Sequence, residues 1–390
     1  MKIFGRREEK ASRVGRVLSL ERLGRPVWTP RDYASLAREG FMRNPVVFRS
    51  VRMIAEAAAS APWLLYDGER EVEGHPLLSL LERPNPVQSG PALMETLYGH
   101  LMVAGNAYLE MVALDGAPRE LFALRPDRVQ VVAGPDGWPQ AFEYTAGART
   151  VRFRQEGVPP PILHLSLFHP LNDHYGFAPV EAAQTSLDIH NAAGAWSKAL
   201  LDNAARPSGA LVYTGEGYLS DEQFERLKSE LEEGYTGTRN AGRPLLLEGG
   251  LDWKTMAMSP RELDFIEAKR EAAREIALAF GVPPMLLGIP GDNTYANYRE
   301  ANRAFWRQTV LPLVNRTAQA LGNWLAPAFG QELRLSFDLD AVEALSTERE
   351  ALWDRVAAAD FLTRDEKRVA VGYGIEAPPV REGGGSEGPR

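Results

Sequence analysis

Two long helix-forming segments that enclose a short mixed insert constrain this chain more than any other feature. The first segment, 178–205, has few helix breakers and predicts a rod of roughly 40 Å at 1.5 Å per residue. The second is expected to start at a capping box, Ser259 to Glu262, and to end at Gly281, where two prolines block continuation. The pattern predicts two rods that are joined at one end.

The insert between the rods combines strand and helix signals. A strand is predicted at 210–213, and Pro244–Leu247 is expected to return beside it before Gly249 and Gly250. Between them Ser220 caps a helix together with Gln223, and acidic residues occupy its first turn. The insert is therefore a small αβ unit.

The part of the chain before the rods is predicted to be an α+β domain. Asn44 and Pro45 are the N-cap and first residue of a helix that extends toward Trp63, and a second helix is expected at 93–104. Turn pairs such as Asp115-Gly116 separate short β-rich runs. The strands are expected at 63–66, 107–113, 120–124, 129–132, 142–144, 151–153 and 162–167.

After the rods, a polar loop at 288–298 leads into a helix that is expected to start near Asn297 and to end near Leu325. Pro312 lies inside that helix and cannot donate to the carbonyl of Gln308, so a kink is expected. A half-buried strand at 333–339 follows. Two terminal helices are expected to be capped by Thr347 with Glu350 and by Thr363 with Glu366.

Composition excludes several classes of protein. The chain has 390 residues, no cysteine and a net charge of −8. Disulfides and cysteine-based metal sites are therefore excluded, and no apolar run approaches the roughly 18–20 residues of a membrane span. A protein that grips DNA tightly is usually basic, so this balance argues against a tight binder but not against one past which DNA slides.

Catalytic signatures are weak. No phosphate-binding glycine loop and no G-x-S-x-G is present. His164, His169 and His174 lie near Asp173, but their five-residue spacing suits neither a helix face nor a strand face. We interpret them as ordinary loop and strand histidines, with a metal site as the less favoured alternative.

Asp338 and Asp340 are two residues apart and would share one face of a strand, as a magnesium site of a nuclease requires. With Glu343 they fit more simply as the solvated edge of a domain. A metal-dependent nuclease that uses them, with His169 or His174, remains the alternative function. A monomeric nucleic-acid binder is the third, because residues 1–30 carry eight basic and three acidic side chains.

The ordered strings from Gly176 to Leu325 resemble those of HK97-like portal proteins of tailed phages and gene transfer agents. The strings, read in chain order, are Gly176–Val180, Asn203–Gly209, Asn240–Gly250 and Ala279–Gly288, followed by the Tyr-containing Asn293–Tyr298. No single string is specific, but their order and spacing together are. The resemblance extends over roughly 45–374.

The resemblance implies a multidomain α+β portal fold with an α+β wing, a two-helix stem, a small αβ clip, a kinked tunnel helix and a short helical crown. The implied segments are a mobile basic arm (1–30), wing (31–177), stem helix 1 (178–208), clip (209–258), stem helix 2 (259–285), tunnel loop (286–298), kinked helix and rest of the wing (299–345), crown (346–375) and disordered tail (376–390).

The same resemblance implies a function without enzymatic activity, cofactor or metal. Copies of the chain, twelve in number, would form a ring at one capsid vertex of a virion or virus-like particle, assembled in the host cytoplasm, through which double-stranded DNA passes. The expected partners are the major capsid protein, the head–tail adaptor and the large terminase, with no membrane. The implied DNA-facing residues are Asp292, Asn293, Thr294, Tyr295 and Asn297, and those of the docking clip are Asp221, Glu222, Glu225, Arg239 and Arg243.

Overall fold

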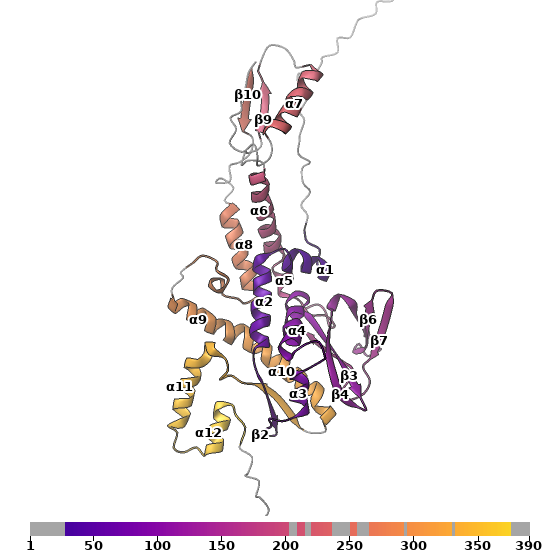
Figure 1. The fold of residues 1–390 in the computed structure, drawn as a ribbon, viewed down its shortest axis with the longest axis vertical. Coiled ribbons are helices and arrows are strands. Elements are labelled where there is room, and N and C mark those ends of the chain that lie inside the picture. Colours follow the sequence, from indigo (N-terminus) through magenta and orange to yellow (C-terminus); the bar gives the residue numbers. More distant parts are fainter. Residues whose placement is uncertain are drawn as a thin grey trace, which may run out of the picture.

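The computed structural model describes residues 28–202, 209–214, 220–235, 250–255, 265–291, 295–329 and 332–375. The molecule is elongated (Figure 1): helices α6 and α8 run side by side from a large mixed domain to a small tip that contains β9, β10 and α7. Four expectations lie mostly or wholly outside the described residues, namely the arm, the tail, the strand at 244–247 and the capping box at Ser259.

The large domain begins with helices that pack on one another. Their bounds are α1 Tyr33–Leu36, the π-helix η1 Ala37–Phe41, α2 Pro45–Ala59, α3 Pro76–Glu82 and α4 Gly90–Ala104. Asn44 caps α2 as predicted, because its Oδ1 accepts from the amides of Val46 and Val47. The sequence analysis missed α1, η1 and α3. Helix α3 nevertheless has a local signal, since His75 caps it and Pro76 is its first residue.

Three antiparallel sheets complete this domain, and each predicted strand in it is confirmed. One sheet has the order β4-β3-β8, with β3 Asn106–Leu114, β4 Ala117–Leu124 and β8 Ile162–Ser166. Another has the order β5-β6-β7, with β5 Val129–Ala133, β6 Pro139–Ala146 and β7 Arg149–Arg154. The third joins distant parts of the chain: β11 Leu333–Phe337 pairs with β1 Trp63–Asp67, which pairs with β2 Arg70–Glu71.

The predicted rods are confirmed in part. The first is interrupted after α5 Pro179–Ala182, and α6 Gln184–Asp202 follows. Ala183 separates them with ψ near 5° instead of a helical value, although no glycine or proline marks this break in the sequence. The second rod is α8 Phe265–Ala279, and the tip between them contains β9 Gly209–Tyr213, α7 Asp221–Tyr235 and β10 Leu251–Thr255.

The chain returns to the large domain through η4 Pro284–Leu287, α9 Tyr295–Phe305, the π-helix η5 Trp306–Val310 and α10 Leu311–Leu325. Pro312 is accommodated by η5, where the amide of Leu311 donates to Trp306 five residues back. The wider π-helical turn thus accommodates a proline, which has no amide hydrogen to donate, and the helix continues through it.

Two helices end the described chain, α11 Ser346–Ala357 and α12 Arg364–Val371. The Thr363–Glu366 capping box is confirmed at α12. The predicted Thr347 cap is wrong: a 3₁₀ turn at Glu343–Leu345 leads directly into α11, whose N-cap is Leu345 and has no side-chain cap hydrogen bond.

Candidate functional site

The paired helices α6 and α8 form the central feature of the molecule. The two helices pack along each other, and both carry buried apolar side chains, among them Leu187 and Ala193 of α6 and Ala272 and Ile276 of α8. The Ser186 hydroxyl also donates to the Glu275 carboxylate across this contact. Close packing and a bridging hydrogen bond fix one rod relative to the other.

Buried polar groups join the base of α6 to the large domain. Asn44, 1% exposed, places its Nδ2 3.1 Å from His190 Nδ1 and donates to Asn191 Oδ1 at 2.9 Å. Asn191 in turn donates to the carbonyl of Glu39, and the Thr29 amide donates to Asp188. Since unpaired buried polar groups are costly, this network specifies one orientation of the rod on the domain.

The tip presents an acidic helix start. Ser220 and Gln223 form the predicted capping box of α7 by exchanging hydrogen bonds at 3.2 and 3.0 Å. The predicted clip residues Asp221, Glu222 and Glu225 are all exposed in the first turns of α7, where negative charge is favourable. Arg239 and Arg243 lie outside the described residues.

The predicted DNA-facing loop is shorter than expected. Helix α9 begins at Tyr295, two residues before its predicted start near Asn297, so the loop ends earlier than residue 298. Tyr295 and Asn297 both lie in the first turn of α9, and Asn297 is exposed there with Tyr298, which is 48% exposed. Asp292, Asn293 and Thr294 lie outside the described residues.

Two side-chain contacts that were not predicted from the sequence fix the segment between α8 and α9. Arg274 of α8 donates to the carbonyl of Pro290 at 2.5 Å. Thr309 of η5 donates to the carbonyl of Gly281 at 2.6 Å, at the left-handed turn that ends α8. Both contacts join residues 16 or more apart in the chain, so helical periodicity alone could not reveal them.

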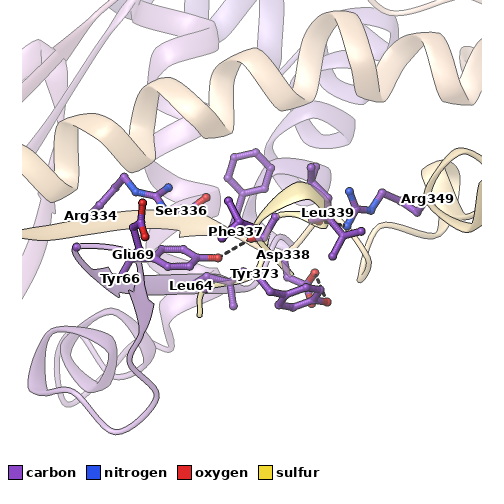
Figure 2. Close-up of a pocket in the computed structure, with 15 residues that line it drawn as sticks. Leu64, Tyr66, Glu69, Arg334, Ser336, Phe337, Asp338, Leu339, Arg349 and Tyr373 are labelled. Carbon is purple, nitrogen blue, oxygen red and sulfur yellow. Dashed lines mark hydrogen bonds between the residues drawn. The ribbon is translucent and has the colours of Figure 1, made fainter. Parts of the chain in front are cut away.

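The pair Asp338 and Asp340 does not form the open face that a nuclease requires. Strand β11 ends at Phe337, and Asp338 accepts from the Asp340 amide in the turn that follows. Figure 2 shows the surroundings, a cavity of about 420 Å³ between β1, β11 and the residues after α12. The solvated-edge interpretation is therefore also incomplete.

Asp340 itself is part of a structural cluster. Its carboxylate accepts from the Arg349 guanidinium, from Trp353 Nε1 at 3.1 Å and from the Tyr373 hydroxyl at 2.8 Å. The hydrogen bond from Arg349 lowers the pKa of Asp340 below its usual value. These donors occupy both carboxylate oxygens, so the Asp340 carboxylate connects α11 to the segment that follows α12.

The three predicted histidines are part of the folded structure, through ring stacking, hydrogen bonds or burial. His164 stacks on Tyr108 at 4.4 Å, lies 3.0 Å from Asn106 Oδ1 through its Nε2, and burial lowers its pKa to about 4. His169 Nδ1 accepts from the amide of Leu171, and His174 Nδ1 is buried without a hydrogen-bond partner. Over the described ranges, no group of three His, Asp or Glu side chains is arranged to hold a metal ion.

The described helices include none that is both long and apolar enough to cross a membrane. The main feature of the described residues is the α6–α8 pair with the tip that contains β9, α7 and β10.

Comparison with known proteins agrees with this geometry. The model of the family described as "Phage portal protein" matches residues 45–372. The portal protein of Enterobacteria phage HK97 is 24% identical over 304 residues, covering 76% of this chain and 70% of that protein.

Two solved structures are more similar. A chain in the neck of an empty gene-transfer-agent particle is 57% identical with a TM-score of 0.71, covering 90% of this chain and 96% of that one. A chain in the neck of a native gene-transfer-agent particle, computed with C12 symmetry, is 56% identical with a TM-score of 0.68 at the same coverage. The resemblance seen in the sequence is confirmed, and the protein is structural and not an enzyme. This chain belongs to the HK97-like phage portal protein family.

Proposed function

We propose that this protein is the portal subunit of a tailed-phage or gene-transfer-agent particle. Twelve copies stand side by side as a ring at one capsid vertex, and double-stranded DNA is packaged and ejected through the hole. The observation that carries the proposal is the α6–α8 pair with its tip, in a chain that the portal family matches over most of its length. The similar native gene-transfer-agent neck was computed with C12 symmetry, which supports the copy number.

The segments then take the roles expected from the sequence. The α6–α8 pair is the stem, the β9–α7–β10 tip is the clip, the large domain is the wing and α11–α12 are the crown. The exposed acidic start of α7 is the docking surface for the large terminase during packaging and for the head–tail adaptor afterwards. The wing faces the major capsid protein.

Residues 292–294 and the first turn of α9 face the DNA in this proposal. Exposed Asn297 and Tyr298 support the assignment, as does the Arg274 contact that fixes the chain entering this segment. A net charge of −8 per chain favours passage over capture, because the duplex carries a negative charge about every 1.7 Å of its axis.

The first experiment is native mass spectrometry and end-on electron microscopy of the purified protein, alone and co-expressed with its capsid protein. Closed rings are expected. A monomer under both conditions at micromolar concentration would contradict the proposal.

The second experiment removes Asp292–Thr294 only, since α9 starts at Tyr295. Rings should form normally, whereas the DNA content of purified particles should fall. Removal of three glycines from the tail, Gly383–Gly385, is the control of equal length. Normal DNA content in the first variant would refute the assignment of this segment.

A further inference from the structure

Two apolar surfaces on the wing have no cover within the described chain. The helix patch consists of Met42, which is 78% exposed, exposed Pro45, and Phe48, which is 41% exposed. The Phe48 ring is held between Phe41, 5.2 Å away between ring centroids, and the Arg52 guanidinium, 5.8 Å from the Phe48 centroid. The Phe48 ring of the helix patch is therefore packed against two neighbouring side chains.

The loop patch consists of Phe168 and Leu171, which are 80% and 91% exposed in the connection between β8 and α5. Hydrogen bonds fix the backbone around them. The amide of Leu171 donates to His169 Nδ1, and Asn172 Oδ1 accepts from the amides of His174 and Tyr175. The Tyr175 hydroxyl also accepts from the Val131 amide at 2.9 Å. The fold thus presents these two side chains outward on a fixed support.

The charges around the two patches are complementary. Four arginines border the helix patch. Arg43, Arg49 and Arg52 form ion pairs with the nearby Glu39, Glu56 and Glu95, whereas Arg38 has no ion-pair partner in the described part of the chain. The loop patch is next to exposed Asp173, which likewise has no ion-pair partner among the residues that the structure describes. Arg38 beside the helix patch and Asp173 beside the loop patch can therefore pair with each other across a contact, which favours one mutual orientation of the two patches.

A closed ring needs two different surfaces on each copy, because each subunit contacts its two neighbours through opposite sides. Large exposed apolar side chains, rimmed by polar groups, are typical of such contacts, with aromatic residues, methionine and arginine enriched. The helix patch and the loop patch are two different surfaces with these properties.

We infer that the loop patch of one copy packs on the helix patch of the next copy, with Asp173 facing the arginine rim. This contact rests on the proposed ring. The occupant of each patch is accordingly a second copy of this chain, and not the capsid protein or a peptide.

The test uses the full chain in two double variants and a control. Met42→Glu with Phe48→Ser disables the helix patch, and Phe168→Ser with Leu171→Ser disables the loop patch. Val87→Ser with Val158→Ser removes two other apolar side chains, 83% and 78% exposed, and serves as the matched control. Circular dichroism confirms that each variant is folded, as expected for exposed positions.

Mass photometry at equal concentrations then gives the ring fraction. Wild type and control should form rings, and the ring fraction of each patch variant should be at least tenfold lower than that of wild type. An equimolar mixture of the two patch variants should form 1:1 heterodimers of twice the chain mass, because that mixture contains one intact contact and one disabled contact.

Each other outcome is decisive. Rings in either patch variant at the wild-type level would overturn the inference and leave the portal assignment intact. Patch variants that stay monomeric when mixed would overturn the pairing of these two surfaces. Absence of rings in the wild type, both alone and after co-expression with its capsid protein, would overturn the proposed function together with the inference.

Discussion

Replacement of Asp340 by alanine should release the C-terminal helices from the sheet. Asp340 accepts hydrogen bonds from Arg349, Trp353 and Tyr373. Arg349 also donates to the carbonyl of Val371, just before the residues that bind the sheet through Tyr66. Loss of the carboxylate leaves the Arg349 charge largely buried without its partner.

The size of the effect follows from burial. Removal of one partner from a fully buried ion pair costs about 3–5 kcal/mol. The Asp340 and Arg349 side chains are 23% and 13% exposed, so solvent screening reduces the cost to about 2–3 kcal/mol. At 1.36 kcal/mol per factor of ten, amides of α12 should then exchange about 30- to 150-fold faster.

Hydrogen exchange followed by mass spectrometry is the suitable assay, since a chain of this size is not expected to unfold in two states. Glu350→Ala, on the same helix and exposed, is the control and should change exchange little. Less than threefold acceleration in Asp340→Ala would refute the reasoning. The pKa of Asp340 is lowered in the folded protein, so its stabilisation is present above the unfolded pKa of 3.8 and is lost as pH falls through the folded value.

Two further predictions concern the wing. Gly105→Ala should abolish folded protein, because Gly105 has a φ of 67° and a new Cβ would lie 2.6 Å from the carbonyl carbon of Gly176. Gly68→Ala is the control: Gly68 has a φ of 61°, but a new Cβ would meet no atom within 4 Å, so the loss of folding free energy should be only about 1 kcal/mol. Equal soluble yield and circular dichroism for both variants would contradict this. Acid should destabilise the wing through His164, because burial lowers the pKa of His164 from 6.5 to about 4. The folded state favours the neutral imidazole, so the free energy of unfolding falls as the pH drops from 6.5 toward 4, by at most about 3 kcal/mol. Urea unfolding at pH 7 and pH 5 should show a smaller pH effect in His164→Gln than in wild type, and an identical pH effect in both would count against this explanation.

Features with local signals could be predicted from the sequence. Asn44, Ser220 and Thr363 each accept a hydrogen bond from a backbone amide no more than three residues further along the chain, and all three predicted caps are confirmed. The wing strands were predictable for the same reason, because glycine-containing turns separate them.

Features that depend on distant partners were not predictable. The role of Asp340 depends on Arg349 and Tyr373, 9 and 33 residues away in sequence, so a carboxylate pair alone suggested a metal site. The π-helix η5 is stabilised by its surroundings and has no residue signature of its own beyond Pro312. Strand β10 was missed because the return strand was assigned to the run before Gly249 and Gly250, whereas Leu251–Thr255 after them pairs with β9.

The pairing of β1 with β11 has a mechanical consequence. Trp63 lies opposite Phe337, so a strand that precedes the paired helices in the chain and a strand that follows them are neighbours in one sheet of the wing. A pull on the tip is carried down both α6 and α8 and reaches the same domain at both ends. Force transmitted through the tip therefore enters the wing through two helices, and the β1–β11 pairing ties together the chain segments before and after those helices.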